Sequence, residues 1–457
     1  MIILEILIAT ELLVWLYAAI IAKWRRGFLL LMLYLPFAGA ITLALNLWQP
    51  SLLFKDVLFI IPTYIGLAYE ALGRKRIARG FPRQIVILAL CLAALVLAQT
   101  VNAGVANSMM ALIGLKIWLF YIPLALAAYA YFDSCYRFLR FCRLLILPSF
   151  IPSAVALLQM GTIRSVGYRA AMELSYGDMA VQTTQRFAGS QFDSALFGRV
   201  PSIFTFAPQF FAFSLAMLVP AYIVWRTDSS ARWRRVGAAA FVASALSTFI
   251  SGERASFIFT PLAIALIFVF DRGIRGLLEG VCLAISGAWL VMSFAFGVSL
   301  GPMYNLVGNL FLNYGSDIAY GGLVQALAVA PFGRGTGTNT GAARYSLTDP
   351  DSFVNIENYY AKAIYELGLP GLLIVAGLFA TILVIGLQVR STMRSSILRC
   401  WAGTLLGFLL VIQLNSFKGW LIDLDPVNVY YWVFCGLLVK LPMLQASELT
   451  RWRYDSI

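Results

Sequence analysis

The chain has 457 residues, of which 61% are hydrophobic and only 12% are charged, and its formal net charge is +13 at pH 7. Its mean hydropathy of +0.83 lies far above the range of soluble domains, which excludes the water-soluble globular and disordered classes. The composition therefore indicates an all-α polytopic membrane protein, and a membrane β-barrel is disfavoured because the apolar runs are continuous rather than alternating.

A membrane-spanning helix needs about 20 consecutive, mostly apolar residues, and by this measure the sequence predicts about thirteen spans. In chain order the predicted spans are 2–22, 28–48, 51–72, 84–104, 108–132, 144–161, 203–225, 236–251, 255–270, 277–299, 370–389, 398–416 and 428–446. The first span is expected to be retained rather than cleaved as a signal peptide, because its basic residues follow the apolar run instead of preceding it.

Lysine and arginine concentrate in short segments, and such segments stay in the cytoplasm. Every one of them follows an odd-numbered predicted span, which places the N-terminus outside and the C-terminus inside. The basic segments are Lys23–Arg26, Arg74–Arg83, Arg137–Arg143, Arg226–Arg235, Arg272–Arg275, Arg390–Arg399 and the tail with Arg451 and Arg453. Topology and anionic lipid headgroups thus account for the positive charge, and nucleic acid is not an expected partner.

The whole chain, residues 1–457, is predicted to form a single integral membrane domain with two long extracytoplasmic loops. The first loop covers residues 162–202. The larger one covers residues 300–356, contains short helices and leads into the segment 357–371. The 6 cysteines fall in spans or at their cytoplasmic ends, so they predict no extracytoplasmic disulfide. Extracytoplasmic chemistry is therefore expected in or beside these two loops.

The sequence contains no histidine. This excludes a histidine-based zinc site and histidine acid–base chemistry within the chain. A proton acceptor would have to be a carboxylate, with lysine or tyrosine as the less favoured choice.

Arginine dominates the positive charge of the predicted extracytoplasmic loops, where lysine is nearly absent. A guanidinium grips phosphate or carboxylate with two parallel hydrogen bonds, so this bias predicts a phosphorylated ligand. The alternative is local pairing with the loop carboxylates Glu173, Asp178, Asp193 and Asp349, since such pairs are common and weak. The arginines are Arg164, Arg169, Arg186, Arg199, Arg254, Arg334 and Arg344.

Arg254 lies in the stretch "STFISGERASF", between two predicted spans that leave almost no loop, so its guanidinium is expected at the membrane boundary. Charged side chains at that depth are commonly functional. The alternative is an arginine that extends to the interface and pairs with Glu253, which could either orient or neutralise it. Arg199, in "FGRVPSIFTFAPQ", takes a similar position at the outer end of the span 203–225.

The stretch "PFGRGTGTNTG", residues 331–341, carries Arg334 and several glycines. Glycines allow the backbone to approach an anion closely. The stretch does not fit a nucleotide-binding motif, because no strand–helix unit surrounds it. A flexible loop without direct ligand contact is the favoured interpretation of the glycines.

The segment "ENYYAKAIYELGLPG", residues 357–371, opens with a carboxylate and an amide and closes with Gly-Leu-Pro-Gly. It predicts a short helix that begins at Glu357 and Asn358 and ends at the glycines, so that the span 370–389 can begin with a proline in its first turn. The alternative is that Glu357 only stabilises a helix N-terminus and that the glycines form an ordinary break between helices.

These motifs resemble the bacterial O-antigen ligases and the related O-antigen and exopolysaccharide polymerases. In that family a long external loop ends in His-Asn, a spacer and Gly-x-x-Gly. Here Asn358 is followed by a spacer of the same length and then by Gly368 to Gly371, and Glu357 stands where the ligases have histidine. "SGERASF" is similar to the family's Ser-x-x-Arg segment, and "GRVPSIFTFAPQ" to its Arg…Ser/Thr-Phe…Pro segment. The resemblance covers residues 199–388.

The resemblance implies a glycosyltransferase that joins polyprenyl-pyrophosphate-linked glycan donor and acceptor at the extracytoplasmic face of the bacterial inner membrane, with no metal, cofactor or nucleotide sugar. Arg199 and Arg254 are the expected catalytic arginines that stabilise the leaving pyrophosphate, and Glu357 is the expected general base. Membrane lipids, flippase proteins and chain-length regulators are further expected partners. The expected substrate-binding residues are Asn358, Arg334, Tyr359 and Glu253.

Glutamate in place of the ligase histidine favours a polymerase, which adds lipid-linked repeat units, over a ligase, which transfers glycan to lipid A core. A lipid-linked oligosaccharide flippase or transporter would explain in-membrane charges such as Asp56 and Glu279, but it predicts charges that converge at the midplane and a repeat architecture. A scaffold subunit would tolerate substitution of Arg254 and Glu357. Alternative bases are Asp317, Asp349 and Glu173.

Overall fold

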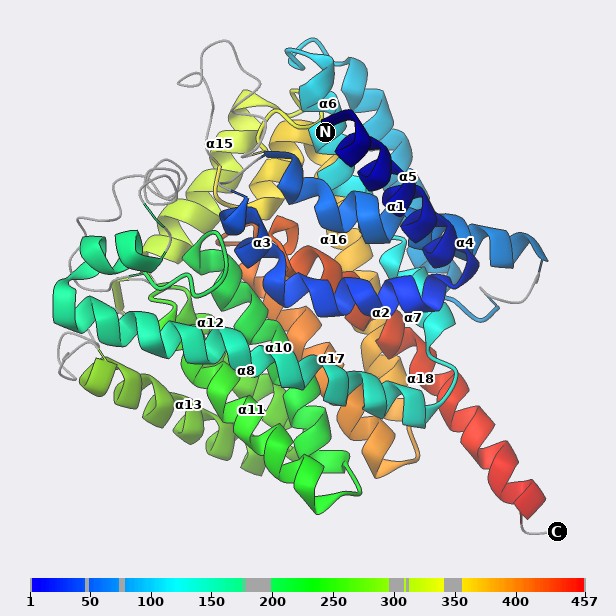
Figure 1. The fold of residues 1–457 in the computed structure, drawn as a ribbon, viewed down its shortest axis with the longest axis vertical. Coiled ribbons are helices and arrows are strands. Elements are labelled where there is room, and N and C mark those ends of the chain that lie inside the picture. The colour runs from blue at the N-terminus through cyan, green and yellow to red at the C-terminus, as the bar shows by residue number, and fades with distance from the viewer. Residues whose placement is uncertain are drawn as a thin grey trace. The chain divides into compact units, whose positions relative to one another are not determined.

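The computed structural model describes residues 2–45, 49–73, 79–175, 177, 199–295, 308–309, 312–340 and 356–455. It is 83% helical, and no strand occurs among these residues (Figure 1). The chain divides into two compact units. Unit 1 comprises residues 1–80, 127–256 and 284–297, and unit 2 comprises residues 81–126, 257–283 and 298–457. The predicted all-α membrane class is confirmed.

Unit 1 is organised around α10 (Ala207–Thr227), which is buried along almost its whole length and packs against α8 (Cys135–Val166) and α11 (Ala231–Ile250). Small residues allow this approach, since a Cβ atom on Gly237 of α11 would lie 2.5 Å from the backbone nitrogen of Trp225. The N-terminal helices of unit 1 are α1 (Ile2–Ala22), α2 (Trp24–Tyr34), α3 (Ala38–Ala44), η3 (Lys55–Ile60) and α4 (Ile61–Gly73).

Unit 2 is organised around α16 (Tyr359–Thr392), which packs against helices from both earlier and later parts of the chain. Its neighbours are α5 (Arg83–Ala98), α15 (Gly322–Val329), α17 (Ser396–Asn415) and α18 (Val427–Asp455). Shorter elements of this unit are η4 (Gln99–Val101), α6 (Ser108–Leu119), η5 (Asn313–Gly321) and η8 (Leu421–Asp423). Three helices contribute residues to both units: α7 (Leu124–Tyr131), α12 (Ser256–Arg272) and α13 (Ile274–Ala295).

Within the described part of the chain, 10 helices are long and apolar enough to cross a membrane. Helices occupy all the predicted spans, but α1, α11 and α12 are not among these ten. α12 has only 17 residues, and α11 begins with three arginines in its first turns. The polytopic class therefore holds, while the predicted number of spans and the orientation remain predictions.

The two segments predicted as extracytoplasmic loops contain helix in part of their described residues. α8 continues to Val166, beyond the predicted loop start at residue 162, and a further helix covers residues 168–175. In the second segment lie η5 and α15, and the assignment of this segment as an extracytoplasmic loop remains a prediction. Residues 178–198 and 341–355 lie outside the described residues.

Gly436 is expected to be intolerant of even a methyl group. A Cβ atom there would lie 2.0 Å from the carbonyl oxygen of Ala125, so Gly436→Ala forces α18 away from its neighbour. Overpacking of this kind costs about 1–3 kcal/mol. The measurement is thermal unfolding of the purified variant in lipid nanodiscs, where the melting temperature should fall. Gly377→Ala in α16 is the matched control, because its Cβ would meet only one atom, at 3.9 Å, and its melting temperature should not fall.

Candidate active site

The motif segment 357–371 starts α16 and then interrupts it. Asn358 is the N-cap of α16, and its Oδ1 accepts hydrogen bonds from the backbone nitrogens of Tyr360 at 2.9 Å and Ala361 at 3.1 Å. The helix is broken at Gly368, whose φ of 78° lies in the left-handed region that favours glycine. The predicted short helix, with its start and its glycine break, is therefore confirmed.

The break at Gly368 accommodates the glycine-rich stretch, residues 331–340. The backbone carbon of Phe332 would lie 2.7 Å from a Cβ atom on Gly368, and the backbone nitrogen of Leu369 donates a hydrogen bond to the carbonyl oxygen of Pro331. Any side chain at position 368 would separate the two segments. The Gly-Leu-Pro-Gly motif thus serves two purposes, since it ends a helix and admits another backbone beside it.

Glu366 holds the glycine-rich stretch from inside unit 2. This fully buried carboxylate accepts hydrogen bonds from the indole nitrogen of Trp118 at 2.7 Å and the backbone nitrogen of Gly337 at 2.8 Å on one oxygen. Its other oxygen accepts from the backbone nitrogen of Asn339 at 2.9 Å and the hydroxyl of Thr340 at 3.2 Å. Both carboxylate oxygens are therefore saturated, which is the condition under which a buried charge is tolerated.

The sequence favoured a flexible loop for residues 331–341. This prediction is wrong for the described residues 331–340, which have a defined conformation held by hydrogen bonds. Gly333, Gly335 and Gly337 all have positive φ, and the backbone nitrogens of the stretch do bind an anion, but that anion is the protein's own Glu366. On its other side the stretch is held by the end of α5, where the hydroxyl of Thr336 donates to the carbonyl oxygen of Val96 at 2.7 Å. Residue types alone could not distinguish an internal from an external anion.

Arg334 projects from this fixed stretch. Its backbone nitrogen donates to the carbonyl oxygen of Tyr365 at 2.7 Å, and its guanidinium lies 5.8 Å from the ring centroid of the same residue. The side chain is exposed and pairs with no carboxylate among the described residues. Its backbone is thus positioned rigidly while its charge stays available.

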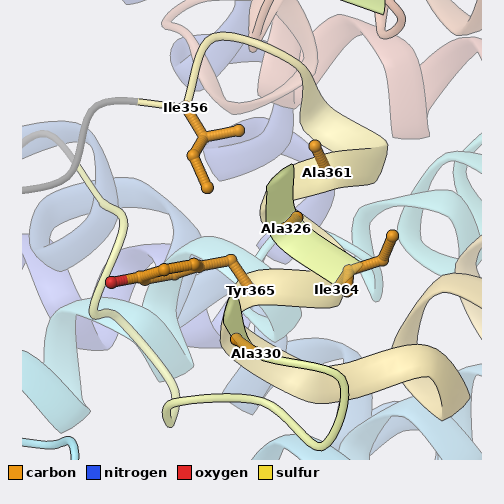
Figure 2. Close-up of a cluster of buried hydrophobic side chains, with 6 residues drawn as sticks. All are labelled: Ala326, Ala330, Ile356, Ala361, Ile364 and Tyr365. Atoms are coloured by element: carbon orange, nitrogen blue, oxygen red, sulfur yellow. The ribbon is translucent and has the colours of Figure 1, made fainter. Parts of the chain in front are cut away.

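Glu357 is exposed, directly before the buried Asn358, and no hydrogen bond or ion pair joins it to the part of the chain that is described. Its position is nonetheless fixed, because the preceding Ile356 is buried in a cluster of apolar side chains between α15 and α16. Figure 2 shows this cluster, in which Ile356 lies near Tyr365. The members are Ala326, Ala330, Ile356, Ala361, Ile364 and Tyr365.

Asn358 and Tyr359 are buried, and the contacts they make are internal to the protein. The side-chain nitrogen of Asn358 donates to the carbonyl oxygen of Ala319 at 3.0 Å, which ties η5 to the start of α16. The ring of Tyr359 stacks on Phe379 and packs against Trp118. These contacts explain how both residues support the segment, and their assignment as substrate contacts remains a prediction.

A buried ion pair below the start of α16 was not identified from the sequence. The ammonium of Lys362 lies 2.5 Å from Oδ2 of Asp423, and its side chain is 1% exposed. It also lies within 6 Å of the ring centroids of Trp118, Tyr359 and Trp420. Burial raises the pKa of the Asp423 carboxyl, and the neighbouring Lys362 opposes that rise. The only sequence signal was a lysine inside a predicted motif helix.

In unit 1, Glu253 forms an ion pair with Arg199 and not with its neighbour Arg254. The guanidinium of Arg199 lies 3.2 Å from Oε1 of Glu253, whose side chain is 7% exposed. Arg199 is held in place from two sides. The backbone nitrogen of Val200 donates to the carbonyl oxygen of Ser251, and the hydroxyl of Tyr168 donates to the carbonyl oxygen of Arg199. Burial raises the pKa of Tyr168 to about 12, so this hydroxyl keeps its proton.

The segment after Arg199 is clamped further along. The side-chain amide of Gln159 makes two hydrogen bonds to the backbone of Ser202, at 2.9 and 3.0 Å. Ser202 has a φ of 56°, a conformation that residues other than glycine seldom adopt and that surrounding contacts must enforce. The backbone from Arg199 to Ser202 is therefore held by hydrogen bonds to Tyr168, Ser251 and Gln159.

Arg254 lies in the tight turn 251–255 that joins α11 to α12, in agreement with the predicted absence of a real loop. Its side chain is exposed and makes no ion pair or hydrogen bond with the described residues. Next to it, the hydroxyl of Ser256 at the start of α12 is fully buried and has no hydrogen-bond partner in the described structure. The proposed alternative, in which Glu253 neutralises Arg254, is not what the structure has.

The predicted site residues therefore form two groups. Arg199, Glu253 and Arg254 belong to unit 1, while Arg334, Glu357, Asn358 and Tyr359 belong to unit 2. Two further predicted arginines, Arg186 and Arg344, lie outside the described residues. Models of known protein families and curated protein sequences were both compared with this chain, and neither comparison found a match.

Proposed function

We propose that the protein is a polysaccharide polymerase that joins polyprenyl-pyrophosphate-linked repeat units at the extracytoplasmic face of a bacterial inner membrane. The observation that carries this proposal is the turn 251–255. Arg254 makes no ion pair with the described residues there, because the adjacent Glu253 is already paired with Arg199. An exposed, unpaired guanidinium between two apolar helices suits a phosphorylated lipid better than a soluble anion.

In this proposal an acceptor hydroxyl attacks the anomeric carbon of the donor glycan. The new glycosidic C–O bond forms as the bond between the anomeric carbon and the pyrophosphate oxygen breaks. Arg254 stabilises the negative charge that develops on the lipid pyrophosphate, and Arg199 supports it by holding Glu253 away from Arg254. The hydroxyl proton passes to Glu357, which is exposed at the start of α16.

The flippase alternative is less well supported by the charges on which it depends. Asp56 lies 3.0 Å from the ammonium of its neighbour Lys55, and Glu279 is paired with Arg272 on an exposed surface. Each of these carboxylates thus has a counter-charge within its own unit.

Deletion of the gene in its native cell separates the three candidates. A polymerase predicts that single lipid-linked repeat units accumulate at the outer face while long polymer disappears. A ligase would instead leave full-length polymer on the lipid carrier, and a flippase would leave single units on the inner leaflet. The measurement is mass analysis of extracted lipid-linked glycans, with an added periplasmic glycosidase to report the leaflet. Polymer of normal length attached to its normal acceptor in the deletion strain would overturn the proposal.

A further inference from the structure

The ion pair of Lys362 and Asp423 lies in the part of unit 2 that carries Glu357. The backbone nitrogen of Tyr359 donates to the carbonyl oxygen of Ser416 at 2.9 Å, which fastens the connection between α17 and α18 to the first turn of α16. Glu357 precedes Tyr359 by two residues. The connection that carries Asp423 is therefore attached to the same helix start as the proposed base.

Lys362 is too deeply buried to meet a bulky ligand, but it fixes the carboxylate beside it. Its ammonium contacts Oδ2 of Asp423, and the side chain is 1% exposed. Asp423 itself is 11% exposed. Its second oxygen accepts no hydrogen bond from the described residues and is not among the fully buried polar atoms. Asp423 thus offers one acceptor oxygen whose direction is set by Lys362.

Trp420 supplies a hydrogen-bond donor, its indole N–H, in addition to the acceptor oxygen of Asp423. Its indole ring is partly exposed and lies 5.8 Å from the ammonium of Lys362, measured to the ring centroid. Its indole nitrogen is buried and has no hydrogen-bond partner in the described part of the protein. A buried donor without a partner is costly and indicates a missing acceptor.

The charges select the kind of ligand. A phosphate or carboxylate would be repelled by Asp423, and a cation would be repelled by Lys362, so the matched pair favours a neutral ligand. An aromatic ring with an N–H donor beside a carboxylate oxygen suits a sugar, because a sugar ring offers an apolar C–H face surrounded by hydroxyls. A hydroxyl bound to a carboxylate makes a strong, charge-assisted hydrogen bond.

We propose that Asp423, Trp420 and Lys362 form a saccharide-binding site for the acceptor repeat unit. Asp423 accepts a sugar hydroxyl on its open oxygen, and Trp420 packs against the sugar ring and donates its indole N–H to a sugar oxygen. Lys362 acts as a positioning residue that orients the carboxylate. The assignment of the bound sugar as acceptor rests on the proposed polymerase function, but the binding of a saccharide here does not.

The decisive variant is Trp420→Phe, which keeps an aromatic ring but removes the indole N–H together with part of the ring surface. The probe is the oligosaccharide released by mild acid from the cell's own lipid-linked repeat unit, so that it has neither lipid nor pyrophosphate. Binding to purified protein in nanodiscs is measured by titration calorimetry. We expect wild type to bind and Trp420→Phe to bind about five- to tenfold more weakly, as for the loss of one hydrogen bond. Asp423→Asn, which replaces the charged acceptor, is expected to weaken binding at least as much.

Trp15→Phe is the matched control, because the Trp15 side chain is 70% exposed in α1. It should bind as wild type does. The melting temperature of Trp420→Phe should stay close to that of wild type, because the removed N–H makes no hydrogen bond with the described residues. Unchanged affinity of Trp420→Phe for the oligosaccharide would overturn the proposal, and so would competition by inorganic pyrophosphate, which would show an anion site.

Failure of the proposed function gives a different pattern. If wild type binds the oligosaccharide through Trp420 but extends no lipid-linked repeat unit, the saccharide site stands and the polymerase proposal fails. If wild type extends the repeat unit while Trp420→Phe binds and extends normally, the polymerase proposal stands and the saccharide site is overturned.

Discussion

Arg254→Ala is expected to lower the rate of glycan extension by about two to three orders of magnitude, the size of effect seen when one electrostatic contact to a transition-state anion is removed. Arg254 makes no ion pair or hydrogen bond with the described residues, and its neighbour Glu253 is held by Arg199. The substitution therefore removes a charge that the fold does not use. The free energy of unfolding should change by no more than about 0.5 kcal/mol, as for most exposed positions.

Two further variants, one conservative substitution and one control, are compared with Arg254→Ala. Arg254→Lys should retain part of the activity, because lysine keeps the charge but loses the two-pronged hydrogen bonding of a guanidinium. Arg169→Ala is the matched control, since Arg169 is an exposed arginine that pairs with Glu173 across one helical turn and with no other carboxylate among the described residues. Rates are measured as polymer formed from a lipid-linked repeat unit per unit time. Wild-type rates for Arg254→Ala would show that the turn 251–255 is not where the pyrophosphate binds.

Glu366→Ala is expected to be the most destabilising single substitution in unit 2, with a loss of about 3 kcal/mol or more in the free energy of unfolding. It leaves the indole N–H of Trp118 and the backbone N–H groups of Gly337 and Asn339 buried without their acceptor. The glycine-rich stretch that carries Arg334 then loses its main internal contact. Unfolding in mixed micelles with increasing sodium dodecyl sulfate is the measurement.

Glu366→Gln separates charge from shape in the same experiment. Glutamine fits the space, but its amide nitrogen must face donor groups that gave hydrogen bonds to a carboxylate oxygen of Glu366. The free energy of unfolding should therefore still fall clearly. Glu279→Ala is the control, because the Glu279 side chain is 50% exposed and its loss should cost less than about 0.5 kcal/mol. If both Glu366 variants unfolded like wild type, the glycine-rich stretch would have to be held by other contacts.

Local sequence patterns predicted local structure well. The apolar runs gave the helical class, and Gly-Leu-Pro-Gly predicted the end of a short helix, because a left-handed break at Gly368 is a property of the residue itself. Asn358 likewise caps α16 because its side-chain oxygen can accept a hydrogen bond from a backbone nitrogen in the first turn of the helix. Each of these outcomes depends on residues within one or two turns of one another.

The contacts that organise the candidate site could not be predicted in this way, because they join distant segments. Glu366 meets Trp118 across 248 positions, and Lys362 meets Asp423 across 61. Adjacency in the sequence made Glu253 a possible partner of Arg254. Successive side chains in a tight turn point in different directions, however, and Glu253 pairs with Arg199 instead. Opposite charges in the sequence identify possible ion-pair partners, but they do not determine which of these partners meet in the fold.

The proposal is tested most directly by polymer formation with purified protein in lipid nanodiscs. The substrate is a polyprenyl-pyrophosphate-linked repeat unit, a metal chelator is present, and products are separated by size. Wild type is expected to produce a ladder of extended glycans, while Glu357→Gln folds normally and produces none or almost none. A folded wild-type protein that leaves the repeat unit unextended would contradict the polymerase function, and a full-length ladder from Glu357→Gln would contradict the role of Glu357 as the base.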